Sequence, residues 1–95
     1  MKYPIKHKES NTGGIFFISQ DNHVITELTY KKREPNIMVI DHTQTKKDLQ
    51  GKGLASYLLD HVVNYAKENK LKIDPLCPFV EIKFEEIEAY QSLKV

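Results

Sequence analysis

A glycine-containing segment, Gln50-Gly51-Lys52-Gly53-Leu54-Ala55, divides the 95-residue chain into two halves with different hydrophobic periods. Before it, apolar residues alternate or form short runs, as in strands. After it, they recur at steps of three and four, as in a helix. Glycine lets the backbone approach a ligand closely, and the first turn of a helix presents unpaired N–H groups with a partial positive charge. We therefore expect a strand-to-helix junction that binds a phosphorylated ligand.

The half before this junction predicts an antiparallel meander of three strands joined by short turns. Asp21-Asn22 is expected to form the first turn. The charged residues 31–34, followed by Pro35-Asn36, are interpreted as a solvated turn, with a basic docking patch as the alternative. The expected strands cover residues 15–18, 24–30 and about 36–42.

The half after the junction predicts a helix, a fourth strand and a short C-terminal helix. Leu58, Val62 and Tyr65 belong to one apolar stripe of the first helix. The expected spans are about 51–69, 71–76 and 81–93. A right-handed crossover would place the fourth strand parallel to the third. The chain is therefore expected to form one α/β (α+β) domain over residues 1–95, with a mixed sheet.

Composition narrows the class of protein. Hydrophobic residues make up 40% of the chain and charged residues 28%, as in an ordinary globular domain. No apolar run approaches the roughly 20 residues of a membrane helix, and the start lacks the apolar core of a signal peptide. A net charge of +1 gives no general attraction to nucleic acid or acidic membrane. With a single cysteine and no zinc-binding spacing, we expect a cytoplasmic protein without a disulfide or metal site.

The glycine segment has neither the Walker spacing nor the three glycines of the dinucleotide pattern. An exposed helix start is the alternative interpretation of these residues. However, Gln50-x-x-Gly53-x-Ala55 resembles the Gln/Arg-x-x-Gly-x-Gly/Ala signature of the GCN5-related N-acetyltransferase superfamily. Asp41-His42-Thr43 before it, and residues 71–80 with Cys77-Pro78-Phe79 after it, are similar to blocks of a minimal single-domain subgroup.

This resemblance implies a truncated fold of that superfamily, without its last two strands. It also implies acetyl-coenzyme A as the cofactor and an unidentified amine as the acceptor. The acceptor site would then be shallow, completed by another chain, or lost. Gln50 would begin the phosphate cradle or cap the helix, and Lys52 would reach phosphate or lie in solvent. The residues expected to bind the cofactor are Met38, Val39, Ile40, Gln50, Gly51, Lys52, Gly53, Leu54 and Ala55.

The resemblance also places the candidate catalytic residues near the expected acetyl group. His42 or Asp41, at the end of the third strand, would act as general base; the alternative for His42 is a bond to a neighbouring backbone group. Cys77 would carry the acetyl group covalently, if His42 comes near it, or would fill the core as a small buried residue. Tyr90 would protonate the departing thiolate or pack in the core.

Three functional classes remain open from the sequence. The first is an acetyl-coenzyme A-dependent N-acetyltransferase, working directly or through a cysteine intermediate. The second is a non-catalytic module that binds coenzyme A or acyl-coenzyme A. The third is a structural or interaction domain, in which the glycine segment only starts a helix. The domain is expected to be a monomer or a weak homodimer that pairs through a sheet edge.

Overall fold

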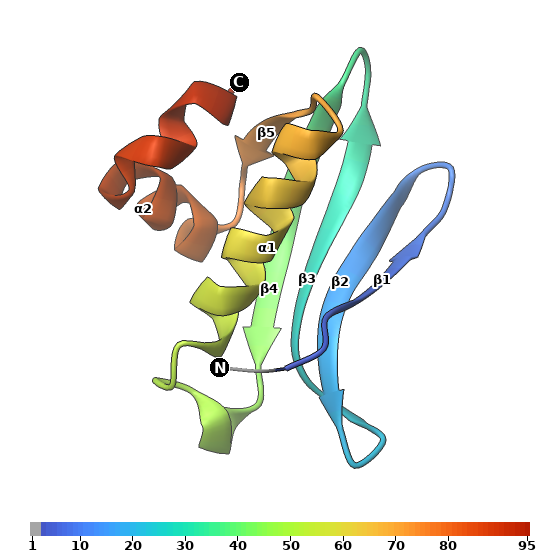
Figure 1. The fold of residues 1–95 in the computed structure, drawn as a ribbon, viewed down its shortest axis with the longest axis vertical. Coiled ribbons are helices and arrows are strands. Elements are labelled where there is room, and N and C mark those ends of the chain that lie inside the picture. Colours follow the sequence, from blue (N-terminus) through green and yellow to red (C-terminus); the bar gives the residue numbers. More distant parts are fainter. Residues whose placement is uncertain (1–2) are drawn as a thin grey trace.

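A five-stranded mixed sheet with strand order β1-β2-β3-β4-β5 forms the centre of the molecule (Figure 1). The computed structural model describes residues 3–95. β1 to β4 pair antiparallel, and β5 adds to β4 in parallel. The predicted fold class and the parallel final strand are thus confirmed, with one strand more than expected. The strands are β1 (Lys6–Glu9), β2 (Gly13–Gln20), β3 (His23–Arg33), β4 (Ile37–Thr45) and β5 (Lys72–Pro75).

The helices follow the meander in chain order. A short 3₁₀ turn, η1 (Lys47–Leu49), leads from β4 towards α1 (Leu54–Glu68), which lies across one face of the sheet (Figure 1). After β5 come α2 (Pro78–Glu86) and a second 3₁₀ segment, η2 (Glu88–Leu93). Within residues 3–95, none of the helices combines the length and the apolar character that a membrane crossing requires.

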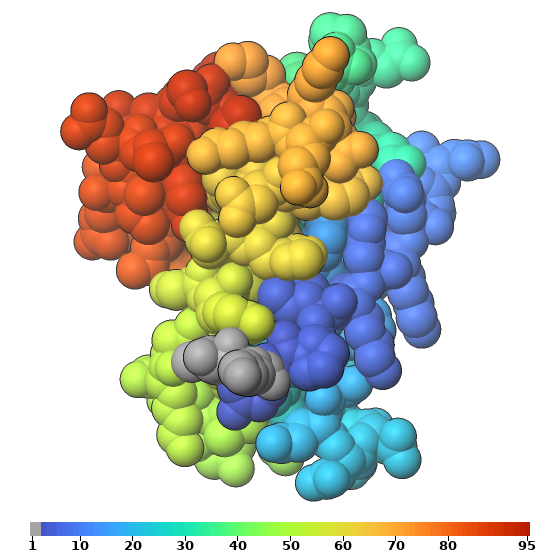
Figure 2. All heavy atoms as spheres, in the orientation of Figure 1, coloured from blue at the N-terminus to red at the C-terminus, as the bar shows by residue number. Residues whose placement is uncertain are grey.

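One hydrophobic core fills the space between the sheet and α1. The alternating residues of β2, β3 and β4 turn one face towards the helix, and α1 meets them with its apolar stripe. Residues 3–5, before β1, lie beside the first half of α1, where the Tyr57 hydroxyl donates a 3.1 Å hydrogen bond to the Tyr3 carbonyl (Figure 2). The most deeply buried core residues include Phe16, Ile18, Leu28, Met38, Ile40, Leu58, Val62, Ile73 and Phe84.

The observed boundaries correct several expectations. α1 begins at Leu54 rather than at residue 51, because Gly51 and Gly53 have φ angles of 81° and 80°, in the left-handed region outside the helix. The charged residues 31–33 extend β3, where Lys32 forms a 2.7 Å ion pair with Glu9, so the turn begins only at Glu34. The C-terminal helix begins at Pro78 rather than at residue 81 and is interrupted at Ile87.

A β-bulge in β4 decides which of its residues face α1. Thr29 pairs with His42 and Tyr30 pairs with Ile40, so Asp41 is an extra residue on β4. Beyond the bulge, Thr43 pairs with the core residue Leu28. A bulge re-aims the side chains that follow it. Thr43 therefore points to the helix-covered face, and His42 points to the opposite face.

Candidate functional site

The loop before α1 owes its shape to two glycines. Gly51 and Gly53 are exposed, and both have the left-handed backbone conformation that other L-residues rarely adopt. A Cβ atom built on either glycine would meet nothing within 4 Å. The glycines are therefore needed for backbone direction rather than for packing, and the space beside them is open.

The first turn of α1 has no side-chain cap. Gly53 is the N-cap residue, and its carbonyl accepts a 2.9 Å hydrogen bond from the Tyr57 N–H. The leading N–H groups of a helix have no partner within the helix, and they carry the positive end of its dipole. The start of α1 therefore has the backbone geometry and the charge of an anion site.

A groove of about 500 Å³ opens at this helix start. It joins parts of the chain that are distant in sequence: the end of β4, the glycine loop, the first turn of α1 and the first turn of α2. Its lining residues are Thr43, Gln44, Thr45, Leu49, Gln50, Gly51, Gly53, Leu54, Ala55, Ser56 and Phe79.

The predicted cofactor residues fall into two groups. Five of the six from Gln50 to Ala55 line the groove, whereas Lys52 is exposed at the loop tip and is not among the lining residues. Gln50 does not cap α1, because its Nε2 donates a 3.1 Å hydrogen bond to the Thr45 carbonyl. This bond holds the loop against the end of β4.

Met38, Val39 and Ile40 lie away from this groove, between two paired strands. Their register partners are Ile73, Asp74 and Pro75 on β5, and Ile40 also accepts hydrogen bonds of 3.0 and 3.1 Å from the N–H groups of Leu76 and Cys77. Their backbone is therefore engaged within the sheet, which corrects the expectation that it would bind a cofactor arm. The edge of β4 that β5 leaves uncovered begins at Asp41 and runs to Thr45.

Cys77 lies beside this uncovered edge, at the N-cap of α2. Its side chain is 7% exposed, and its carbonyl accepts a 2.9 Å hydrogen bond from the Glu81 N–H. The sulfur lies 3.2 Å from the Thr43 hydroxyl oxygen. Since Thr43 lines the groove, the sulfur is one side chain away from it.

His42 does not meet Cys77. It is exposed on the opposite face of the sheet, and its Nε2 lies 3.4 Å from Oε1 of Gln44, on the same face. Asp41 also lies on that face, where its carboxylate accepts a 2.7 Å hydrogen bond from the Thr29 hydroxyl. The structure thus separates the two predicted catalytic residues, and the polar partner of the thiol is Thr43. Thr43 belongs to the Asp41-His42-Thr43 motif, and the sequence predicts no role for it.

Tyr90 is a core residue rather than part of the groove. Its side chain is 6% exposed and packs on Phe84, with ring centroids 5.3 Å apart. Its hydroxyl donates a 3.0 Å hydrogen bond to the Asp60 carboxylate. Burial, and then this bond to Asp60, raise the pKa of Tyr90 to about 12.

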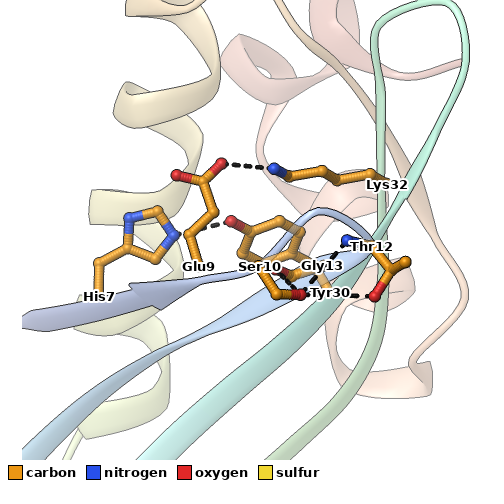
Figure 3. A network of polar contacts seen from close by, with 7 residues as sticks. All are labelled: His7, Glu9, Ser10, Thr12, Gly13, Tyr30 and Lys32. Carbon is orange, nitrogen blue, oxygen red and sulfur yellow. Dashed lines mark hydrogen bonds and ion pairs between the residues drawn. The ribbon is translucent and has the colours of Figure 1, made fainter.

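A second, larger groove of about 570 Å³ lies at the other end of β4, beside Ile37 and Met38. Figure 3 shows the polar network on its rim, where Lys32 forms its ion pair with Glu9 and the Tyr30 hydroxyl lies 2.7 Å from Nε2 of His7. Burial is the main cause that lowers the pKa of His7, and Lys32 lowers the pKa of Glu9. The two cationic residues that line this larger groove both form ion pairs: Lys32 with Glu9, and Arg33 with Asp74 at 2.8 Å. The smaller groove, at the uncapped start of α1, is therefore the candidate anion site.

No metal-binding site is evident in the part of the chain that the structure describes. Among residues 3–95, no group of three or more His, Cys, Asp or Glu side chains is arranged to hold a metal ion. The His7 ring, for example, packs against another side chain: it stacks on Phe16 with ring centroids 3.8 Å apart.

Comparison with known proteins adds independent findings. The sequence model of the family described as GCN5-related N-acetyl-transferase matches residues 15–93. The solution structure of a GCN5-like candidate N-acetyltransferase from Staphylococcus aureus is 33% identical, with a TM-score of 0.74, over 95% of this chain and 87% of its own. No curated protein matches the chain in sequence.

Two longer enzymes have a similar structure. A ribosomal-protein-alanine N-acetyltransferase from Brucella melitensis shares the fold at 18% identity and a TM-score of 0.64, over 82% of this chain and 62% of its own. An IAA acetyltransferase from Bacillus cereus is 28% identical, with a TM-score of 0.58, over 65% of this chain and 42% of its own. The chain thus spans less than two thirds of either enzyme.

Proposed function

Because the chain belongs to the GCN5-related N-acetyltransferase family, we propose that it transfers an acetyl group from acetyl-coenzyme A to an amine. The family resemblance expected from the sequence is confirmed by the match over residues 15–93. The observation that carries the proposal is the left-handed glycine loop, which opens onto a groove shared by the uncapped start of α1 and the surroundings of Cys77.

The diphosphate of the cofactor would bind at the glycine loop. The N–H groups of Gly51, Gly53, Leu54 and Ala55 would donate to it, and the dipole of α1 would favour its negative charge. The residues fit such a group, since no side chain caps this helix start and the space beside both glycines is open. Lys52 would add a positive charge at the loop tip.

The pantetheine arm would lie along the uncovered edge of β4, residues 41–45. A strand edge without a neighbour presents backbone donors and acceptors that an amide-containing chain can pair with. This position replaces the one expected at Met38 to Ile40, whose backbone is engaged in the sheet. The thioester would then arrive near Thr43 and Cys77.

Two routes of transfer follow from the position of Cys77. In the first, the Cys77 thiolate attacks the thioester carbon, so a new C–S bond forms and the bond to the coenzyme A sulfur breaks. The amine then attacks this enzyme thioester, the C–N bond forms, Cys77 leaves as thiolate and the amine proton passes to a base. In the second, the amine attacks acetyl-coenzyme A directly. In either route His42 or Asp41 would accept the amine proton from the open face.

Coenzyme A binding is the first test. With ligand at about 100 times its dissociation constant, binding stabilises a protein by roughly 2.7 kcal/mol, so the melting temperature should rise by several degrees. Isothermal titration calorimetry would give the stoichiometry, expected to be one. If neither coenzyme A nor acetyl-coenzyme A shifts the melting temperature, the proposal is wrong.

Intact mass after exposure to acetyl-coenzyme A distinguishes the routes. An adduct of one acetyl group that forms on the wild type, disappears in Cys77→Ala and is discharged by an amine supports the cysteine route. Amide product without any adduct supports direct transfer. A second candidate, a coenzyme A-binding module without turnover, is favoured because His42 and the Cys77 sulfur lie on opposite faces of the sheet. It predicts binding with neither adduct nor product.

A further inference from the structure

We infer that Thr43 is the positioning residue for Cys77: its hydroxyl donates a hydrogen bond to the sulfur and stabilises the thiolate. This inference rests on the proposed function, because it gives Cys77 the role of nucleophile. The inference is based on one contact: Oγ1 of Thr43 lies 3.2 Å from Sγ of Cys77, although the two residues are 34 positions apart in the sequence.

The direction of this hydrogen bond follows from chemistry. In the thiol state either atom can donate, but a thiol is only a weak donor. In the thiolate state the sulfur has no hydrogen, so only the threonine hydroxyl can donate. A hydrogen bond to a charged acceptor is about twice as strong as one between neutral groups. The contact therefore favours the reactive form of the cysteine.

The surrounding backbone fixes both partners. Cys77 is held by its N–H, which donates to the Ile40 carbonyl at 3.1 Å, and by its place at the N-cap of α2, with Pro78 following. Thr43 is held by its pairing with Leu28. The start of α2 adds the positive end of a helix dipole beside the sulfur. The Thr43 hydroxyl can therefore donate a hydrogen bond to the thiolate without any rearrangement of the backbone.

Thr43 also connects the sulfur with the groove. It lines the groove together with Gly51 and Gly53, whereas Cys77 lies behind it. When the thiolate attacks the thioester, its electron pair forms the new C–S bond, and the coenzyme A sulfur leaves with the electrons of the old bond. Thr43 keeps its proton throughout, so its part is to orient and stabilise.

The test uses the single cysteine of the chain as its own reporter. The rate of Cys77 alkylation by iodoacetamide, followed by intact mass without any coenzyme A, reports the thiolate. At about pH 7, Thr43→Val should slow alkylation about tenfold, the effect of losing one hydrogen bond to a charged group. Thr43→Ser, which keeps the hydroxyl, should restore the rate to within about threefold of wild type.

A matched control is Thr26→Val, which removes a buried sheet hydroxyl that bonds Thr45 rather than sulfur. It should alkylate like the wild type. Equal rates for wild type and Thr43→Val at about pH 7 would overturn the inference. So would equal slowing in Thr43→Val, Thr43→Ser and Thr26→Val.

The outcome is independent of acetyl transfer. If the wild type takes up no acetyl group while the alkylation pattern holds, the positioning role of Thr43 stands and the cysteine route fails. If the acetyl adduct forms on Cys77 while Thr43→Val alkylates normally, the cysteine route stands and this inference fails.

Discussion

His42 and Thr43 are adjacent in sequence, but their side chains lie on opposite faces of the sheet. Thr43 contacts the Cys77 sulfur on the helix-covered face, whereas His42 contacts Gln44 on the other. The two residues are therefore placed for different steps of a transfer reaction. Thr43 is positioned for the nucleophile, and His42 for an acceptor that approaches from the open face.

Replacing His42 with asparagine should separate these steps. In His42→Asn, acetylation of Cys77 by acetyl-coenzyme A should stay within about twofold of wild type, because His42 does not contact the sulfur. Discharge by an amine should slow by about a hundredfold or more, the usual contribution of a general base. Single-turnover intact mass measures both steps. Slower acetylation with normal discharge would contradict the assignment.

Valine at position 53 should weaken coenzyme A binding while the fold survives. A left-handed residue other than glycine costs roughly 1–2 kcal/mol, and a β-branched one is especially unfavourable there. Because the position is exposed, with nothing within 4 Å of a Cβ, that strain would displace the loop rather than the core. The dissociation constant should rise at least about tenfold, or about 1.4 kcal/mol, by calorimetry.

Asparagine at the same position is the matched control, since it tolerates the left-handed region. Gly53→Asn should bind more tightly than Gly53→Val. Equal and unchanged affinities in both variants would place the phosphate elsewhere on the protein.

Removing the Tyr90 hydroxyl should affect stability and leave chemistry unchanged. Tyr90→Phe loses the bond to Asp60, and since Asp60 is exposed, water can take its place. The free energy of unfolding should fall by about 1 kcal/mol in urea titrations. The acetylation rate per folded molecule should stay within about twofold of wild type. A large loss of rate at unchanged stability would instead give this tyrosine a role in protonating the leaving thiolate.

The stability of the fold should decrease as the medium becomes mildly acidic, partly through His7. Burial lowers the pKa of His7 below its ordinary value of 6.5, an effect that Glu9 opposes and that His61 and Lys32 reinforce. The unfolded chain then takes up a proton at a pH where the folded chain does not. The contribution of His7 is therefore fully present above about pH 6.5 and is lost as the pH falls through the lowered folded value.

His7→Phe should retain stacking on Phe16 but remove this titration. The difference in unfolding free energy between about pH 7.5 and about pH 5.5 should be smaller in His7→Phe than in the wild type. An identical pH dependence in both proteins would show that His7 titrates normally in the folded state.

The parts of the fold with strong local signals could be predicted from sequence. The three- and four-residue spacing of apolar residues predicted α1, and the glycine segment predicted the strand-to-helix junction before it. β1 was missed because its residues, Lys6–Glu9, carry almost no apolar side chain. Its inward residue is His7, whose stacking on Phe16 exists only in the folded protein. α2 begins three residues before the expected helix start at residue 81, with Pro78 in its first turn, where proline is common.

The site could be predicted only in part, for a similar reason. The glycine loop is local, and its residues meet in one groove. The contact between Thr43 and Cys77 joins β4 to the start of α2, and it depends on a bulge. No pattern of residue types in a single sequence marks which position of a strand will be the extra one. Whether His42 or Thr43 faces Cys77 could therefore be decided only from the register between β3 and β4.

The extra residue in β4 has a consequence for engineering. Deleting Asp41 would remove the bulge yet keep both directions, because His42 would then follow Ile40 directly and stay opposite Thr29. Pairing Asp41 itself with Thr29 would instead shift the register by one residue, turning the imidazole of residue 42 inward to the thiol and the hydroxyl of residue 43 outward to water. A one-residue shift in the pairing of one strand, rather than any change of residue type, separates a hydroxyl–thiol pair from an imidazole–thiol pair in this scaffold.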